Sequence, residues 1–151
     1  MDKTDKLLLE LLQKDSNLTH KQLAGLLNLS VTPVYERIKR LERSGFIQKY
    51  VALVDPEKID KTLIAFTSIS LKEHSTSYLK KFEEDIQQVR EVIECYHIAG
   101  QYDYLLKIVI RDMKEYQKVV MDQLASMENI VNVQSSFVLT EVKRSTELPI
   151  D

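Results

Sequence analysis

The sequence predicts an α+β protein of two domains, an N-terminal helix-turn-helix followed by a domain with the element order βαββαβ. Three observations predict this class. Residues 1–54 hold three short segments with helical spacing of apolar residues, separated by turn residues. The rest of the chain contains β-branched and alternating apolar segments, typical of strands, with two helical segments between them. Residues 1–54 carry nine Lys and Arg against six Asp and Glu, whereas residues 55–151 carry twelve against seventeen.

The first two helices are predicted from apolar spacing and from one capping signal. Residues 5–14 are apolar on all sides, which is typical of a helix at the centre of a small bundle. Residues 15–17 have loop composition. Thr19 followed by Gln22 predicts a capping box that opens the second helix. The core face of this helix is formed by Leu23, Ala24, Leu26 and Leu27.

A third helix is predicted after a turn at residues 28–30. Ser30 can cap this helix, and Pro33 is tolerated because the first turn needs no internal donors. From Val34 to Leu41 the apolar residues recur at helical spacing and face inward. Gly45 then ends the helix in the left-handed conformation.

The outward side of the third helix is predicted to contact double-stranded DNA. A basic helix that follows another helix and a tight turn is the pattern that places side chains in the major groove. Thr32 and Tyr35 are best placed for base edges, and Glu36 can accept from cytosine. A charged residue can instead be a solvated surface group, which we favour for Glu36 and Glu42 but not for the basic cluster. The predicted contacts on this helix are Thr32, Tyr35, Glu36, Lys39, Arg40 and Arg43, together with Arg37 beside the buried stripe.

Residues 46–53 are predicted to form a strand that supports the third helix as a wing or connector. Lys49 in this strand would lie near the DNA backbone. Asp55-Pro56 breaks the strand. We therefore expect a DNA-binding domain over residues 1–54, a hinge over residues 55–62 and a second domain over residues 63–151.

The second domain is predicted to contain four strands and two helices. A hairpin at Gly100-Gln101 joins the two central strands. The order of these elements is that of a split-βαβ, or ferredoxin-like, fold. The strands are predicted over residues 63–71, 92–99, 102–110 and 131–142, and the helices over residues 75–89 and 113–127.

The predicted strands are apolar on both faces, which indicates a dimer. In residues 102–110, Leu106 and Ile108 fall on one face, whereas Leu105 and Val109 fall on the other. Two helices can cover only one face of a four-stranded sheet, and the sheet of a second copy is the simplest cover for the other. We therefore predict an obligate homodimer, whose two-fold axis suits paired half-sites on DNA.

Several function classes are disfavoured by the sequence. It shows no phosphate-cradling Gly-rich loop, no metal-spaced Cys and His set and no nucleophile elbow, so we predict no catalytic residue, metal site or cofactor. The apolar runs are too short to cross a bilayer, and no apolar signal core follows the N-terminal residues, so we expect a cytoplasmic protein without membrane contact. Cys95 has no partner for an internal disulfide, and we interpret it as a small buried apolar residue.

Four segments carry a resemblance to a known family. They are DKLL at residues 5–8, LSVTPVYERIKRLERSGFIQKYVALVDP at 29–56, ECYHIAGQYDYLLKIVIRDMKEYQ at 94–117 and SSFVLTEVK at 135–143. On these residues the chain resembles the Lrp/AsnC, or feast/famine, regulators over essentially its full length. The helix-turn-helix stretch alone is moderately specific, and its occurrence together with AGQYDYLLK is highly specific.

The resemblance implies a winged helix-turn-helix, a ligand-binding (RAM) domain, and dimers that assemble further, commonly into octamers. It implies a sequence-specific transcriptional regulator whose assembly or DNA affinity changes when an amino acid or similar metabolite binds between dimers. The effector loop would be Gly100, Gln101, Tyr102, Asp103 and Tyr104, with Asp103 placed to take an ammonium group and the two tyrosines to wall a pocket. Ser135 and Ser136 match the last-strand region that faces this loop, and their hydroxyls favour a polar amino acid.

Three alternatives stay open beside this interpretation. Residues 100–104 can be an ordinary hairpin with core tyrosines. The chain can be an enzyme, because sirohaem decarboxylases resemble this family in both domains and would hold tetrapyrrole propionates with His or Arg. The histidines, His20, His74 and His97, do not fall at ligand spacing, so we favour the regulator. The third alternative is an architectural DNA-binding protein that acts without a ligand.

Overall fold

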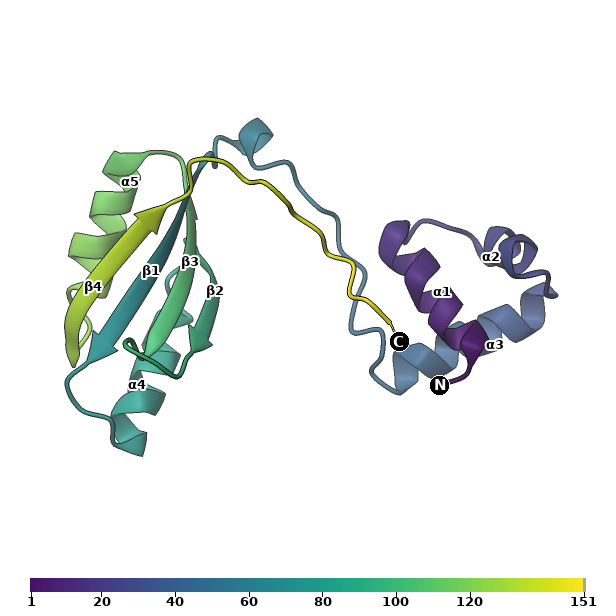
Figure 1. Cartoon of the computed structure of the whole chain (residues 1–151), viewed down its shortest axis with the longest axis horizontal. Coiled ribbons are helices and arrows are strands. Elements are labelled where there is room, and N and C mark those ends of the chain that lie inside the picture. Colours follow the sequence, from purple (N-terminus) through teal and green to yellow (C-terminus); the bar gives the residue numbers. More distant parts are fainter. Residues whose placement is uncertain (151) are drawn as a thin grey trace. The chain divides into compact units, whose positions relative to one another are not determined.

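The structure, a computed structural model, describes residues 1–150 and divides the chain into two compact units (Figure 1). The first unit comprises Met1–Leu53 together with the segment that starts at Val142, and the second comprises Val54–Glu141. The sequence-based interpretation assigned the residues after Val142 to the second domain, whereas the structure groups them with the first unit. Within residues 1–150, no helix is both long and apolar enough to cross a membrane.

The first unit is a bundle of three helices. They are α1 (Lys3–Lys14), α2 (His20–Leu27) and α3 (Val31–Arg43). Leu8, Leu23 and Val34 are fully buried at its centre, so each helix contributes to one shared core. The periodicity of the sequence therefore located all three helices, with boundaries that differ by no more than two residues for α1.

Local signals define the ends of these helices. Thr19 and Gln22 form the predicted reciprocal capping box at the start of α2. Asn28 ends α2 in the left-handed conformation with a φ of 52°, and Gly45 follows α3 with a φ of 75°. The prediction for Ser30 is wrong in one respect, because Ser30 occupies the N-cap position of α3 but its side chain makes no capping hydrogen bond.

The predicted strand over residues 46–53 is not formed. This segment has no strand assignment, and most of its apolar side chains, such as Phe46 and Val51, are exposed, whereas Ile47 is half-buried. A strand needs a neighbour to satisfy its backbone groups, and no ladder reaches this segment in the described part of the chain. The β-branched and aromatic composition was therefore a signal of extended backbone alone.

The second unit is the predicted ferredoxin-like domain. Its antiparallel sheet has the strand order β2-β3-β1-β4, which is the order of a split-βαβ fold. The chain enters this unit through a short 3₁₀ helix, η1 (Glu57–Ile59). The strands are β1 (Leu63–Leu71), β2 (Val92–His97), β3 (Tyr104–Ile110) and β4 (Ile130–Phe137), and the helices are α4 (Thr76–Ile86), α5 (Met113–Lys118) and the π-helical turn η2 (Val119–Leu124).

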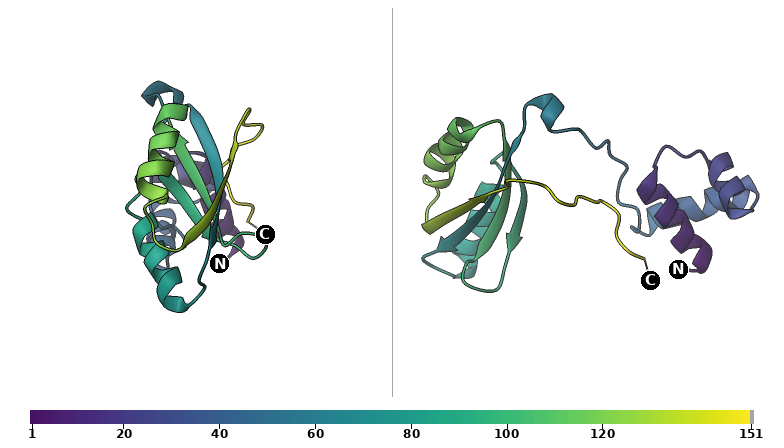
Figure 2. Two further views of the ribbon diagram at one scale, coloured as in Figure 1. Left: turned by 90° about the vertical axis from the view of Figure 1, so that its left-hand side faces the viewer. Right: turned by 45° about the horizontal axis from the view of Figure 1, so that its top comes forward.

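The helices of the second unit lie on one face of the sheet (Figure 2). Alternate residues of β3 are buried against them, including Leu106 and Ile108, which are fully buried. On the opposite face, Phe66 of β1 is 39% exposed and Tyr96 of β2 is 51% exposed. The second face of the sheet is therefore uncovered in the single chain, as the two-sided apolar pattern predicted.

Three expectations for the second unit need correction. β4 ends at Phe137 rather than at residue 142, because β1, its only neighbour in the sheet, begins at Leu63 and offers one more carbonyl, from Ile64 to Val138. Cys95 is exposed rather than buried, since it lies on the edge strand β2. The expected hinge over residues 55–62 belongs to the second unit, where the Lys61 ammonium lies 2.8 Å from the Glu115 carboxylate.

Candidate DNA-binding helix and effector loop

The recognition helix α3 exposes one face and buries the other. Val34, Ile38 and Leu41 are at most 3% exposed and anchor the helix to the bundle. The predicted DNA contacts Thr32, Tyr35, Glu36, Arg40 and Arg43 are all exposed, as is Lys49 in the segment that follows, whereas Arg37 and Lys39 are half-buried.

Tyr35 lies in a small cluster that fixes its ring. The His20 ring from α2 meets it edge-on, with 5.2 Å between ring centroids. The Lys39 ammonium lies 5.9 Å from the ring centroid, and it also donates to the Glu42 carboxylate at 2.8 Å. The hydrogen bond that Lys39 donates to Glu42 raises the pKa of Lys39, which stays charged at neutral pH. Tyr35 is therefore contacted by α2 through His20 and by its own helix, α3, through Lys39.

Arg37 and Arg40 hold the start of α1 as well as facing outward. Asp5 is 2% exposed, and its carboxylate accepts from Arg37 Nη1 at 2.8 Å and from Arg40 Nη2 at 2.7 Å. Asp2 accepts a second hydrogen bond from Arg37. The Asp2 and Asp5 side chains also cap α1 reciprocally. We call these four side chains, Asp2, Asp5, Arg37 and Arg40, the carboxylate clamp.

The carboxylate clamp leaves Arg40 more available than Arg37 for contact with another molecule. The Arg37 side chain is 27% exposed and is held by both carboxylates, so its role is to join α3 to α1. The Arg40 side chain is 54% exposed and keeps guanidinium donors for a further partner. Burial, the largest single influence, disfavours the charged form of Asp5, but the hydrogen bonds from Arg37 and from the Asp2 N–H, together with the charge of Arg40, leave the pKa of Asp5 below its usual value. The sequence pattern did not reveal this clamp, because its partners are more than thirty positions apart.

The predicted effector loop lies between β2 and β3. Gly100 has a φ of 145°, a conformation that other residues rarely adopt, and Gln101 beside it is exposed. Tyr102 is half-buried, and its hydroxyl donates to the Gln134 side chain of β4. The loop is therefore connected to the edge strand at the other side of β1 through Gln134, a residue that the sequence-based site did not include.

Asp103 uses its carboxylate to hold the end of β1. Its Oδ2 accepts from the Leu71 N–H at 2.7 Å, and its Oδ1 lies 2.9 Å from Nε2 of His74. The His74 side chain is 58% exposed, so it can move away from Asp103 and be solvated by water instead. Asp103 thus uses Oδ2 to hold the backbone of β1, whereas its Oδ1 contacts an exposed side chain that a ligand can replace.

Tyr104 belongs to the core rather than to a pocket wall. It is 1% exposed, packs against Phe82 and stacks on His97, and its hydroxyl donates to Glu83 at 3.0 Å. Burial, followed by the hydrogen bond to Glu83, raises the pKa of this phenol. The alternative of a core tyrosine, kept open above, therefore describes Tyr104 but not Tyr102.

Ser135 and Ser136 point to opposite faces of the sheet. Ser135 lies opposite Thr67, and its hydroxyl is hydrogen-bonded to Thr67 at 3.0 Å and to Tyr116 on the helix side. Ser136 lies opposite Phe66 and is exposed on the uncovered face. The period of two along a strand would have separated these serines, and it would have placed Gln134 beside Ser136. Among residues 1–150, no group of three or more His, Cys, Asp or Glu side chains could hold a metal ion.

Comparison with known proteins adds relatives that match this architecture. A model described as the Lrp/AsnC ligand binding domain matches residues 64–148, and one described as winged helix-turn-helix DNA-binding matches residues 1–48. The DNA-binding transcriptional activator DecR of Escherichia coli is 39% identical over 100% of this chain and 99% of its own length. The leucine-responsive regulatory protein of the same species is 36% identical over 99% of this chain and 92% of its own.

A solved structure shows the same fold. The transcriptional regulator NMB0573 of Neisseria meningitidis, crystallised as a complex with L-Met, superposes with a TM-score of 0.95. It is 36% identical, and the match covers 99% of this chain and 96% of that protein.

Proposed function

Because this chain belongs to the Lrp/AsnC family of DNA-binding transcriptional regulators, we propose that α3 reads DNA and that the second unit binds an amino acid which alters the DNA affinity. The observation that carries the first part is the exposed face of α3, with Arg40 and Arg43 outward on a helix that three buried residues hold in place. A regulator of this kind acts in the cytoplasm, where chromosomal DNA is accessible.

The DNA contacts divide by their availability. Thr32, Tyr35 and Glu36 lie in the first half of α3, the part that approaches base edges in this class of domain. Arg40, Arg43 and Lys49 supply charge for phosphates, with Lys39 as a partly engaged member of the same group. Arg37 is assigned to positioning, because both carboxylates of the clamp already occupy it.

Exchange of one exposed arginine tests the reading face. Arg43→Ala removes a charge that neutralises a phosphate, so we expect weaker binding to every duplex tested and a salt slope reduced by about one unit. The measurement is fluorescence anisotropy of a labelled duplex that the protein has enriched from a random pool, at several salt concentrations. Arg90→Ala is the matched control, since Arg90 is an exposed arginine of the second unit. Equal salt slopes for both variants would reject this face.

The amino-acid site is proposed at the loop of Gly100–Gln101–Tyr102–Asp103, with Gln134 and Ser136 as neighbours on the uncovered face. The complex of a 36%-identical regulator with L-Met supports an amino acid as the ligand class. An α-ammonium group can replace His74 at Asp103 Oδ1 while Oδ2 keeps the Leu71 N–H. Because Ser135 is engaged by Thr67 and Tyr116, its hydroxyl no longer argues for a polar side chain on the ligand.

A thermal-shift screen against the twenty amino acids tests the site. A ligand that binds only the native state raises the melting temperature as its occupancy rises. We expect a shift for at least one amino acid, and loss of that shift in Asp103→Asn, which removes the charge but keeps an oxygen for the Leu71 N–H. Glu73→Gln, an exposed carboxylate nearby, is the matched control. A shift that survives Asp103→Asn would exclude this carboxylate from the site.

The uncovered sheet face is the proposed dimer interface. Ile64, Phe66, Leu105 and Val109 supply apolar surface there, and the salt bridge between Lys107 and Glu94 lies beside Phe66 on the same face. A second copy brings an identical face, so the pairing is isologous and closes with two-fold symmetry. Assembly of these dimers into an octamer is the larger form that the family resemblance favours.

A further inference from the structure

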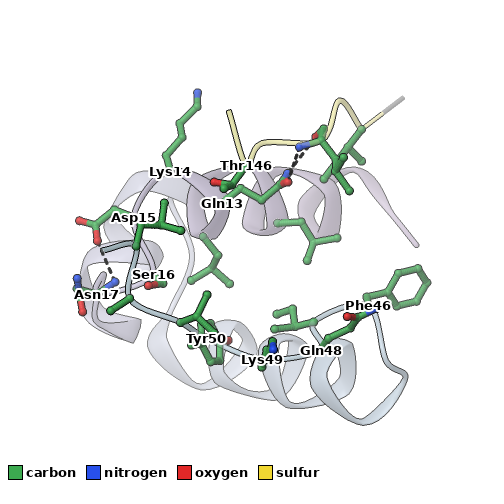
Figure 3. Close-up of a pocket in the computed structure, with 18 of the residues that line it drawn as sticks. Gln13, Lys14, Asp15, Ser16, Asn17, Phe46, Gln48, Lys49, Tyr50 and Thr146 are labelled. Atoms are coloured by element: carbon green, nitrogen blue, oxygen red, sulfur yellow. Dashed lines mark hydrogen bonds between the residues drawn. The ribbon is translucent and has the colours of Figure 1, made fainter. Parts of the chain in front are cut away.

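The first unit contains a groove whose lining includes one proposed DNA contact, Lys49, and none of the proposed ligand-binding residues. It is lined by the second half of α1, by residues 46–53 and by C-terminal residues 146 and 148–150, and its volume is about 770 Å³ (Figure 3). Leu9, Leu12 and Ile47 present half-buried apolar side chains to it.

The C-terminal tail, which we define as residues 142–150, already contacts this groove. Gln13 Nε2 donates to the Leu148 carbonyl oxygen at 3.1 Å, and the Leu148 N–H donates to Gln13 Oε1 at 2.7 Å. Figure 3 shows both bonds as dashed lines from Gln13. A side-chain amide that donates to and accepts from one residue reproduces the bond pair of a neighbouring strand. Ile150, two positions along, lines the same groove and is half-buried.

The tail comes directly from the last strand of the ligand-binding unit. β4 ends at Phe137, and the chain passes from the second unit to the first after Glu141. The two units are therefore joined by two stretches of chain, one at Leu53–Val54 and one at Glu141–Val142. The family model for the ligand-binding domain extends through residue 148, whereas the structure groups residues 142–148 with the DNA-binding unit.

We propose that the C-terminal tail, which forms one wall of this groove, docks on α1 through Gln13 and is a releasable strap between β4 and the DNA-binding unit. Both hydrogen bonds between the tail and Gln13 are solvent-exposed, and the Leu148 side chain is 74% exposed. Few contacts must therefore break for the tail to leave α1. Such weakly held segments exchange between bound and free forms without unfolding of the whole domain.

The strap gives the ligand-binding unit a mechanical route to α1. Gln134 of β4 accepts from Tyr102 of the effector loop, and the same strand continues into the tail. A ligand that displaces Tyr102 would act on the strand that leads to Gln13. This consequence rests on the proposed effector site, whereas the docking of the tail does not.

Hydrogen exchange measured by mass spectrometry on the full-length protein, without any ligand, tests the docking. The two hydrogen bonds predict that amides of the peptide around Leu148 exchange about five- to tenfold more slowly than in an unstructured chain. Gln13→Ala should abolish this protection. Gln13→Glu keeps the acceptor but loses the donor, so it should retain part of the protection. Gln48→Ala is the matched control, because Gln48 lines the same groove and makes no hydrogen bond in the described part of the chain.

Each result has a defined meaning for the strap. Protection that is lost in Gln13→Ala and kept in Gln48→Ala supports the docking. Tail amides that already exchange at unprotected rates in the wild-type protein would overturn it, as would equal protection in all variants. Protection that disappears when the protein is diluted to monomers would assign the tail to a neighbouring copy, and would overturn the intramolecular strap. Because no ligand or DNA is present, these outcomes do not depend on the proposed effector or operator contacts.

Discussion

Asp5 is a buried carboxylate that links the start of α1 to α3 in the DNA-binding bundle. It accepts from Arg37 and Arg40 of α3 and caps α1 together with Asp2. Loss of one partner from such a buried pair leaves a charge without compensation, which is costly. Asp5 therefore contributes to the position of the recognition helix as well as to stability.

We expect Asp5→Asn to lower the free energy of unfolding by about 2 kcal/mol at pH 7, measured by urea denaturation. Because the folded-state pKa of Asp5 is depressed, its contribution is complete above the unfolded value of about 3.9 and is lost as the pH falls through the folded value. The difference between wild type and variant should therefore hold from pH 7 to 5 and shrink below pH 4. A difference that persists unchanged at pH 3 would contradict this origin.

Cys95 illustrates a residue whose exposure does not make it reactive. Partial burial, followed by the nearby charge of Glu83, raises the pKa of its thiol to about 11. The thiolate fraction at neutral pH is correspondingly small. We expect alkylation by iodoacetamide at pH 7.5 to be at least about tenfold slower in the folded protein than in the same chain unfolded in urea. Equal rates in both states would show that the thiol is not shielded.

For the side chains of α3, the sequence predicted which residues are exposed better than it predicted their hydrogen-bond partners. The outward residues of α3 follow from a period of 3.6, which a sequence displays directly. The partners of Arg37, Asp103 and Ser135 come from other elements, and their selection depends on how those elements pack. Asp103 and Ser135 were interpreted from the family pattern, which says nothing of the hydrogen bonds they make within the chain.

The helices of the first unit show which local signals form stabilising contacts. Thr19 and Ser30 occupy the same N-cap position on α2 and α3, but only Thr19 accepts the capping hydrogen bond, from the Gln22 N–H at 3.3 Å. Thr19→Ala should therefore cost about 1 kcal/mol, whereas Ser30→Ala should cost clearly less. Urea denaturation of the two variants measures the difference. An equal loss in both would mean that the Thr19 bond contributes nothing beyond N-cap geometry.

The strands show where local signals fail. The strands predicted over residues 63–71 and 102–110 correspond to the two central strands, β1 and β3, although β3 begins only at Tyr104. Residues 46–53 have similar composition but no neighbouring strand, so they remain extended without a ladder. Residues 138–142 run past the start of β1 for the same reason. Strand formation depends on a partner that can lie far along the chain, and a local pattern cannot supply that information.

The whole protein is a two-unit regulator, and we propose that a second copy covers the exposed face of its sheet. Phe66 lies near the middle of that face, paired between Lys107 and Ser136. Because Lys107, opposite Phe66, is already paired with Glu94, a carboxylate introduced at position 66 would be buried without a partner of its own and would oppose association. We expect Phe66→Glu to convert the protein to monomers in size-exclusion chromatography with light scattering. Met121→Glu, at a 70%-exposed position of η2, is the control and should keep the wild-type mass. A wild-type mass for Phe66→Glu would place the dimer contact elsewhere.

The two units were predictable as separate domains because their periodicities and charges differ. The return of the tail to the DNA-binding unit was not, because its contact with α1 joins residues 135 positions apart. That contact depends on one glutamine side chain, and a single glutamine in a sequence gives no sign of its partner. The contact between the tail and α1 is therefore a feature that the sequence pattern of neither domain predicts.

We propose that amino-acid binding to the second unit changes the DNA affinity of the first. The most direct test is the anisotropy titration of an enriched duplex, performed with and without a saturating concentration of the amino acid that gives the largest thermal shift. Linkage requires that a ligand which favours one state alter the dissociation constant, and couplings of this kind commonly amount to about 5- to 150-fold. We predict a change within that range, absent in Asp103→Asn. The same dissociation constant with and without bound amino acid would contradict the account.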